Sequence, residues 1–454
     1  MTIANRETHV PDGVPLDAAP SRSPRRRLYR FAKTLYRAIP RPLRALAYPI
    51  AAKSVLIRRL RPEVWIIAGE EQVSHLPLSV CLYAATNENR IYLQNLIFGS
   101  SFRARYIGRI WLWNAFTGLP EAAKGCSIVI ADVHDRHLKL MGARAGIIIP
   151  AWVRGYVDLP RSPAVIRRDS VKDIQRRIRR EGLEFEVTRD LQSFDYFYQN
   201  MHVPYLKGRY GDSAVVSSRE EIKAQFDNGE LILVKKKGEY ISGAIVSYQG
   251  ELASFPYLGV LDGRWEFVAG GAISASYEFV LQHLETTSCR KANFGQSRAF
   301  LNDGVLRFKK KYGYEIVNST IHKFLTKVVS DTNATRAFLR NNPFIVERSG
   351  KFYGVVFLDG EVPPTPQTLQ EINKQHSHAG LLKILVCSFS PDATTKSEVP
   401  KPLPDLNPDG SSRPPGQPHY EYLSQAEWMS LIGELGAIGI DNVIAICPDV
   451  EGKP

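Results

Sequence analysis

Residues 293–313 read NFGQSRAFLNDGVLRFKKKYG, and this stretch carries most of the information about the fold. Gly295 and Gly304 free the backbone at two turns, because glycine adopts conformations that other residues avoid. Phe308 predicts an anchored short helix that fixes the neighbouring Lys309. Two side chains of the first loop can donate hydrogen bonds: Ser297 and Arg298. Such a loop suits an anionic or carbonyl ligand; the alternative is a turn followed by a solvated run of lysines.

The segments around this stretch alternate between strand-like and helical patterns. We expect strands at Leu183–Arg189, Glu230–Lys235, Tyr240–Tyr248, Leu252–Leu258 and Lys291–Phe294, and a final strand pair within Tyr314–Lys323. We expect helices at Phe194–Met201, Ser218–Asp227, Gly271–Leu284 and Val305–Lys311. The third of these helices repeats apolar residues at helical spacing, so it should pack on a sheet. Three hairpin-connected strands followed by such a helix indicate an α+β fold.

Four parts are expected along the chain: residues 1–61, 62–165, 166–326 and 327–454. The second part has the pattern of an α/β unit, and the third is the α+β domain. The last part has the pattern of a small accessory α/β module, interrupted by a mobile loop, residues 391–418, that holds eight prolines. Its expected elements are Tyr353–Leu358, Pro366–Lys374, Leu382–Phe389, Gln425–Leu435 and Asn442–Cys447. Ser424 and Glu427 predict a capping box for its last helix.

Residues 293–313 resemble the F-G-x-S … D-G-x-x-x-[FY]-K-x-x-[WY]-G signature of the FemAB-like branch of the GNAT acyltransferase superfamily, often described as BioF2-like acetyltransferases. Residues 197–211 are similar to the F-Y-x-x-M-x-x-P-Y … R-x-G segment of the same branch. Residues 149–153 resemble the segment that precedes its domain. The resemblance covers roughly residues 145–320.

The resemblance implies an α+β fold with a GNAT-like mixed sheet and flanking helices, preceded by an α/β half and followed by the small α/β module. A second, degenerate GNAT-like unit is one alternative for the preceding half. The acyl donor would lie at the open strands and at the start of the next helix, where a pyrophosphate is stabilised by the helix dipole. The expected donor-binding residues are Gly270, Gly271, Ala272, Gly295, Ser297 and Arg298. The expected acceptor-binding residues are Tyr198, Tyr205 and Arg209.

Attack of an amine on an activated acyl carbonyl requires removal of the amine proton and donors for the developing oxyanion. The expected catalytic residues are Lys309, Asp303 and Tyr312. Asp303 is the nearest acidic candidate for the base, with or without an intervening water. Tyr312 would protonate the leaving group, and Lys309 with Arg298 would bind phosphate or stabilise the oxyanion.

Two departures from the family pattern concern the donor. Residues 264–272 do not match the usual GNAT phosphate loop, and Asn293 stands where the relatives have Asp. FemAB relatives without that loop take aminoacyl-tRNA. We expect acyl-CoA as a co-substrate, no tightly bound cofactor, and a small-molecule or lipid-linked amine of a cell-envelope or polysaccharide precursor as acceptor. The alternatives are an aminoacyl-tRNA-dependent peptidyltransferase of the peptidoglycan-bridge type, the only case with a tRNA partner, and a catalytically silent GNAT-fold binding protein.

The positive charge is concentrated at the start of the chain. Residues 1–61 hold 14 of the 59 Lys and Arg residues but only three of the 46 acidic residues. Residues 1–22 have a disordered pattern, and residues 23–39 predict a helix with one apolar and one basic face. We expect residues 23–61 to bind an anionic membrane surface, which would make the protein cytoplasmic and peripherally attached. A helix packed on the body, or an organelle-targeting peptide, is the alternative.

Several classes of protein are disfavoured. The five cysteines are at least 45 residues apart, which argues against disulfide frameworks and thiolate zinc sites. His134 and His137 lack a convincing third ligand, so no metal site is expected. The nearly balanced charge after residue 61 argues against DNA binding. Motifs of P-loop nucleotide hydrolases, dehydrogenases, serine esterases and zinc proteases are absent from the sequence.

Overall fold

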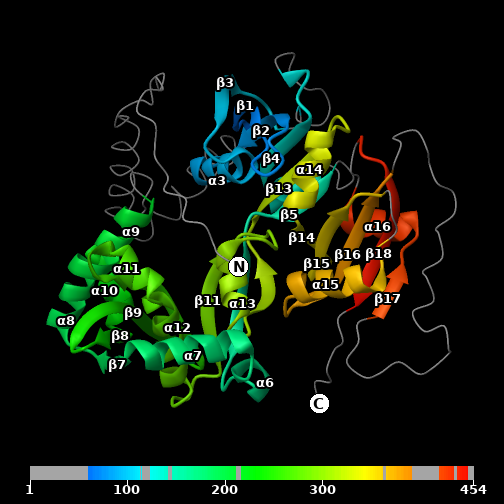
Figure 1. The fold of residues 1–454 in the computed structure, drawn as a ribbon. Coiled ribbons are helices and arrows are strands. Elements are labelled where there is room, and N and C mark those ends of the chain that lie inside the picture. Colours follow the sequence, from blue (N-terminus) through cyan, green and yellow to red (C-terminus); the bar gives the residue numbers. More distant parts are fainter. Residues whose placement is uncertain are drawn as a thin grey trace, which may run out of the picture. The chain divides into compact units, whose positions relative to one another are not determined.

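The computed structural model describes residues 60–112, 114, 123–141, 146–210, 216–360, 364–390, 419–433 and 437–447, whose strands form three mixed sheets (Figure 1). The expected basic arm, apart from its last two residues, and the proline-rich loop 391–418 lie outside these residues. No helix within the described residues is long and apolar enough to span a membrane.

Six strands form the first sheet, in the order β3-β1-β2-β4-β13-β5. They are β1 (Glu63–Glu70), β2 (Pro77–Ala84), β3 (Phe102–Arg109), β4 (Ile128–His134), β5 (Ile147–Pro150) and β13 (His322–Val328). β2 and β4 are parallel, and all other neighbours are antiparallel. The N-cap Thr86 starts α3 (Asn87–Phe98), which buries Leu93 and Ile97 in the core. α5 (Asp135–Met141) follows β4.

Seven strands form the second sheet, in the order β12-β6-β11-β10-β9-β8-β7. They are β6 (Val153–Asp158), β7 (Leu183–Thr188), β8 (Gly229–Lys236), β9 (Glu239–Gln249), β10 (Leu252–Val260), β11 (Lys291–Ser297) and β12 (Glu315–Ser319). β7 to β10 form an antiparallel meander, and β11 joins it parallel to β10. β6 lies antiparallel between β11 and β12.

Helices pack on both faces of the second sheet. One face carries α8 (Leu191–Tyr196), the π-helix η2 (Phe197–His202), α9 (Val203–Tyr210) and α10 (Arg219–Phe226). The other carries α7 (Asp169–Glu181) and α12 (Ala272–Leu284). Alternation along β8 explains this, since Leu231 and Leu233 pack with α8 to α10 whereas Ile232 and Val234 pack with α12. The remaining helices are α6 (Pro163–Ile166), η4 (Leu261–Gly263), α11 (Trp265–Ala269) and α13 (Gly304–Lys310).

The third sheet contains the strands after residue 327, in the order β14-β15-β16-β18-β17. They are β14 (Phe344–Arg348), β15 (Lys351–Leu358), β16 (Leu381–Phe389), β17 (His419–Tyr422) and β18 (Ile440–Cys447). Its helices are α14 (Asn333–Asn341), α15 (Pro366–His376) and α16 (Gln425–Ile432). α15 connects the parallel strands β15 and β16, and the expected capping box of Ser424 and Glu427 is confirmed.

The expected α+β class, with a mixed sheet flanked by helices, is confirmed. Most of the expected elements between residues 183 and 311 are found, with ends that differ by a few residues. One expectation is wrong: the strands within Tyr314–Lys323 do not pair with each other. β12 pairs with β6 in the second sheet, whereas β13 pairs with β4 and β5 in the first.

The first and second sheets exchange strands. The chain passes from β5 in the first sheet to β6 in the second through residues 151–152, and it returns from β12 to β13 through residues 320–321. The expected divisions at residues 165 and 326 therefore do not separate the two sheets. β6 precedes the division at residue 165, but its hydrogen-bonded partners are in the second sheet. Most of β13 precedes the division at residue 326, but its partners are in the first sheet.

A buried ion network joins the segment after β6 to α12. Arg161 Nη1 lies 2.8 Å from Glu278 Oε2, and Arg161 Nε lies 2.7 Å from Glu285 Oε1. Arg161 and Glu278 are both buried, and Gln175 and Gln282 each donate a further hydrogen bond to Glu278. Loss of the guanidinium would leave the Glu278 carboxylate buried without a compensating charge.

We predict that Arg161→Met lowers the free energy of unfolding by about 3–5 kcal/mol, because removing one partner of a buried pair leaves the other charge uncompensated. Chemical denaturation followed by circular dichroism measures this change. Arg176→Met is the matched control, since Arg176 makes an exposed pair with Asp173 at 2.8 Å. The control should change stability by less than about 1 kcal/mol. Equal effects of the two substitutions would contradict the prediction.

Candidate active site

The second sheet opens between β10 and β11. These parallel strands are in register over only three residue pairs, Leu252–Ser254 with Lys291–Asn293. Beyond that point each strand shifts register against its other neighbour, β10 between Ser254 and Tyr257 and β11 between Asn293 and Gln296. The two strands thus separate in the middle of the sheet, and this opening is where the candidate site is built.

Gly295 lies at the irregular part of β11. Its φ of +70° is a left-handed conformation that favours glycine, and its N–H donates to Asn293 Oδ1 at 2.8 Å. Its carbonyl accepts a hydrogen bond from the Tyr314 hydroxyl at 3.2 Å. Gly295 therefore makes the bend that turns the following Gln296 carbonyl toward α13.

Lys309 points from α13 to this bend. Its Nζ donates to the Gln296 carbonyl at 2.7 Å and lies 5.4 Å from the centre of the Tyr314 ring. The residue is 3% exposed, and burial lowers the pKa of its ammonium group to about 8, although Asp303 opposes this shift. Lys309 can therefore change its charge near neutral pH, as few lysines do.

Asp303 starts the same helix. Its Oδ1 accepts hydrogen bonds from the N–H groups of Val305 at 3.1 Å and Leu306 at 2.9 Å, as an N-cap does. Burial raises the pKa of its carboxyl group, while the two helix N–H groups and the charges of Arg298 and Lys309 act in the opposite direction. Asp303 and Lys309 are thus brought together, but one carboxylate oxygen is engaged by the helix.

Arg298 lies just after β11, at the junction between the first two sheets. Its guanidinium carbon is 3.5 Å from the centre of the Trp152 ring and 4.0 Å from that of Tyr92. Its Nη1 donates to Asn89 Oδ1 at 2.7 Å and to the Ala151 carbonyl at 3.4 Å. Burial lowers its pKa to about 10, so Arg298 stays charged at neutral pH and ties the signature loop to α3.

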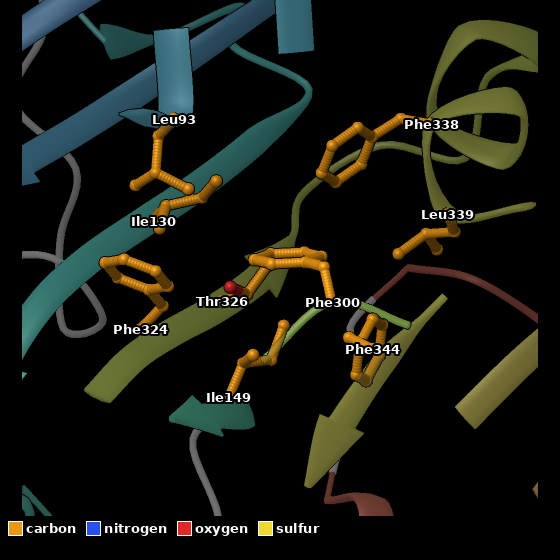
Figure 2. Close-up of a pocket in the computed structure, with 9 residues that line it drawn as sticks. All are labelled: Leu93, Ile130, Ile149, Phe300, Phe324, Thr326, Phe338, Leu339 and Phe344. Carbon is orange, nitrogen blue, oxygen red and sulfur yellow. The ribbon is translucent and has the colours of Figure 1, made fainter. Parts of the chain in front are cut away.

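The backbone after Arg298 is held by the third sheet. Ile345 N–H donates to the Ala299 carbonyl at 2.9 Å, and Leu301 N–H donates to the Pro343 carbonyl at 2.8 Å. Phe300 lies between these bonds, and its ring is one of the side chains that line an apolar cavity shown in Figure 2. The volume of this cavity is about 10 Å³, which is at the lower limit for one water molecule. The cavity is therefore a small gap between packed apolar side chains and not a ligand site.

Two expected site residues are enclosed. Ser297 is completely buried, and it pairs with Val153 in the ladder between β11 and β6. Tyr312 is also completely buried, and its hydroxyl donates to the Ser274 carbonyl at 3.1 Å. Its ring packs against Tyr277 and Phe308 at centroid distances of 5.6 and 5.4 Å. Tyr312 thus belongs to the aromatic core between α12 and α13, and its expected role as a proton donor to the leaving group stays a prediction.

The expected phosphate-binding residues lie at the start of α12. Gly270 ends α11, Gly271 caps α12 with a φ of +97°, and the buried Ala272 begins it. A cavity of about 220 Å³ opens beside them and is lined by Ser170, Asp173, Ile174, Arg177, Ile178, Leu183, Gly271, Ser274 and Lys311. A side chain at position 271 would meet Arg177 Cδ at 2.6 Å. The cavity thus combines a helix start with two basic side chains, Arg177 and Lys311.

The expected acceptor residues lie on the opposite face of the sheet from α12. Tyr198 belongs to η2 and donates its hydroxyl to the Ser217 carbonyl at 3.3 Å. Tyr205 and Arg209 are one turn apart on α9, and Arg209 Nη1 donates to the Tyr205 hydroxyl at 2.8 Å. η2 is fixed on β10, since His202 Nδ1 lies 2.8 Å from the Leu258 carbonyl oxygen. These three residues therefore lie at the side of the opening that β10 forms, whereas Lys309 lies at the side that β11 forms.

The sequence motifs did not reveal the partners of Arg298. Asn89 and Tyr92 lie on α3, about 200 residues before Arg298. A spacing of three residues indicates that Asn89 and Tyr92 share one face of a helix. The sequence around them does not indicate that this face contacts a distant loop. Trp152 does lie in a stretch that resembles the family, although its stacking on Arg298 follows only from the exchange of strands.

Known proteins give limited comparisons. No family model matches the chain, and no curated protein matches it. Among solved structures, L-PGS from Bacillus licheniformis is 15% identical, with 46% of this chain and 70% of that chain covered and a TM-score of 0.30. FemX is 13% identical, with 58% and 84% covered and a TM-score of 0.31. A GCN5-related N-acetyltransferase from Sphaerobacter thermophilus is 13% identical, with 44% and 58% covered and a TM-score of 0.29.

Proposed function

We propose that this protein is an N-acyltransferase that moves an acyl group from acyl-CoA to the amine of a cell-envelope or polysaccharide precursor, at the cytoplasmic face of a membrane. The observation that carries the proposal is the opening between β10 and β11, with Lys309 at its edge. Strands that separate leave backbone groups for an extended ligand, which can bind as an added strand. The pantetheine arm of acyl-CoA is such a ligand.

The cavity at the start of α12 supports a phosphate-bearing donor. Arg177 and Lys311 supply positive charge, and the helix start supplies the positive end of its dipole. Asp173 also lines the cavity, so the positive field there is partly offset. In this arrangement the donor phosphates lie on the α12 side of the sheet, while Tyr205 and Arg209 meet the acceptor on the α9 side.

The proposed reaction joins a donor on the α12 side of the sheet to an acceptor on the α9 side. A neutral amine attacks the thioester carbonyl, its proton leaves to a base, and the C–S bond breaks with its electron pair on sulfur. Protonated Lys309 stabilises the developing oxyanion or a donor phosphate. Arg298 holds the loop between Lys309 and α3 and acts as a positioning residue, since its guanidinium already contacts Trp152, Tyr92 and Asn89.

Donor binding should raise the melting temperature. A donor at 100 times its dissociation constant contributes about 2.7 kcal/mol, which corresponds to several degrees. Thermal unfolding with acetyl-CoA, longer acyl-CoAs and adenosine 3′,5′-bisphosphate measures this effect. A shift that depends on the acyl chain is the expected result, and the bisphosphate controls for phosphate binding alone. Absence of any shift in folded protein would contradict acyl-CoA as donor and favour aminoacyl-tRNA or a silent binding protein.

Lys309 should give the rate a pH dependence. Its pKa of about 8 lies below the ordinary lysine value, so its charge is present at neutral pH and is lost as the pH rises through about 8. If the cation is required, kcat/KM falls roughly tenfold between pH 8 and 9.5. Lys309→Ala should abolish turnover without unfolding the protein, and Lys309→Arg should remove the alkaline fall.

Lys310→Arg is the matched control for this profile. The neighbouring Lys310 also has a pKa lowered to about 8, through burial and the charges of Arg168 and Arg307, but its Nζ bonds to carbonyls at the end of α15. The control should keep the wild-type pH profile. A rate that rises through pH 8 in the wild type would instead assign neutral Lys309 as the base, and full activity of Lys309→Ala would remove it from the site.

Membrane attachment should depend on residues 23–61. Their basic and apolar faces favour anionic vesicles over neutral ones, because each Lys or Arg near an anionic surface contributes about 1 kcal/mol. Co-sedimentation of the full chain with phosphatidylglycerol-containing and phosphatidylcholine-only liposomes measures the difference. A chain that begins at Arg61 is the control and should remain in the supernatant. Equal binding to both vesicle types, or none, would exclude the membrane proposal.

A further inference from the structure

A buried carboxylate outside the signature motifs is connected to Arg298 of the signature loop through Asn89. Asp132 of β4 is 1% exposed. Its Oδ2 accepts hydrogen bonds from Asn89 Nδ2 at 3.0 Å and from the Thr86 hydroxyl at 3.4 Å. Its Oδ1 lies 2.9 Å from His322 Nδ1. A carboxylate enclosed in this way is costly unless nearby groups compensate its charge.

The compensating charge is that of Arg298. Asn89 bridges the two ions, since its Oδ1 accepts from Arg298 and its Nδ2 donates to Asp132. Three hydrogen bonds therefore run from Arg298 through Asn89 and Asp132 to His322. All but His322 are buried, so the chain of bonds is protected from water and couples the signature loop to the first sheet.

His322 is the open end of this chain of bonds. It is the first residue of β13, directly after the passage between the two sheets, and its side chain is 18% exposed. Because a carboxylate accepts at Nδ1, the neutral ring carries its proton on Nδ1 and leaves the lone pair of Nε2 free to take a proton. The preceding Ile321 is 52% exposed, so solvent reaches this end of the strand.

The expected base of the signature, Asp303, is less suited to this task. Burial raises the pKa of its carboxyl group, but its Oδ1 already accepts hydrogen bonds from two N–H groups of α13. A proton taken at Oδ1 would therefore displace the N-cap of that helix. His322 has the opposite arrangement, since its carboxylate partner stabilises the imidazolium that forms when Nε2 takes a proton.

We propose that the Asp132–His322 pair is the proton acceptor for the amine substrate, and this rests on the proposed acyl transfer. The amine nitrogen forms its bond to the carbonyl carbon, and its surplus proton moves to Nε2 of His322. The imidazolium then gives the proton to the departing thiolate, directly or through water, which balances the step without an added reactant. Asp132 fixes the orientation of the ring through its contact with Nδ1.

Charged and titratable groups from several elements surround His322. Asp132 faces it from β4, and the His134 ring, its partner across the strands, lies 5.9 Å from its centroid. Lys323 follows it on β13 and pairs with Glu347 of β14 at 2.7 Å and with Asp135 at 3.9 Å. Arg298 is connected to it through Asn89 and Asp132.

The test compares two histidines of this chain that have the same kind of partner. His283 Nε2 lies 2.5 Å from Glu230 Oε1 and its side chain is 19% exposed, but this pair belongs to β8 and α12 and is not connected to Arg298. His322→Gln, Asp132→Asn and the control His283→Gln are assayed for thiol release from acetyl-CoA with D-glucosamine or glycylglycine. Binding of acetyl-CoA by each variant is measured separately from its thermal shift.

We expect His322→Gln to lose at least about 100-fold in kcat, within the range that general base catalysis contributes, with acetyl-CoA binding unchanged. Asp132→Asn should also lose activity, His322→Ala should regain part of it with added imidazole, and His283→Gln should match the wild type. Normal turnover of folded His322→Gln would overturn this inference alone. Failure of the wild-type protein to bind any acyl-CoA would overturn the proposed function and this inference with it.

One measurement needs no variant. Long-range ¹⁵N–¹H NMR of the wild-type protein reports which nitrogen of each neutral histidine ring carries the proton. The Nδ1–H form of the neutral His322 ring is expected. A neutral His322 ring protonated on Nε2 would overturn the inference even if every substitution at position 322 prevented folding.

Discussion

The arrangement of the first two sheets depends on the enclosure of one guanidinium. Arg298 lies between the rings of Trp152 and Tyr92, and its edge is bonded to Asn89 and Ala151. A buried cation is expensive, and stacking on two aromatic faces together with charge-assisted hydrogen bonds offsets that cost. Because the four partners come from α3 and from the passage between the sheets, the signature loop can adopt its observed course only when both are in place.

The fold could be predicted where the signal is local. The meander β8 to β10, the amphipathic α12 and the capping box at Ser424 follow from alternation, helical spacing and side-chain capping, and all are found. The pairing of β12 and β13 could not be predicted in this way. Only two residues separate these strands, which indicated a hairpin, but their partners β6 and β4 lie more than 150 residues earlier. Long-range pairing leaves no trace in the local pattern.

The candidate site shows the same limit. The environment of Lys309 was predictable in part, since Phe308 anchors α13 and the glycines allow the bend at Gln296. The burial of Tyr312 could not be predicted, because an aromatic residue at the end of a short helix has the same pattern whether it faces a ligand or the core. Asp132 and His322 carried no motif, and they meet only because β4 and β13 are neighbours in the first sheet. A site whose residues come from strands far apart in the sequence cannot be recognised from the spacing of those residues.

Because the first two sheets exchange β6 and β13, the chain cannot be divided into two separate halves. A protein made of two separable halves can be cut, shuffled or expressed in pieces, because each half closes its own ladders of hydrogen bonds. Here a cut anywhere between β6 and β12 removes β13 from the first sheet and also divides the second sheet, and the open edges that result recruit other chains. The first two sheets can therefore close their hydrogen-bonded ladders only when both are made on one continuous chain.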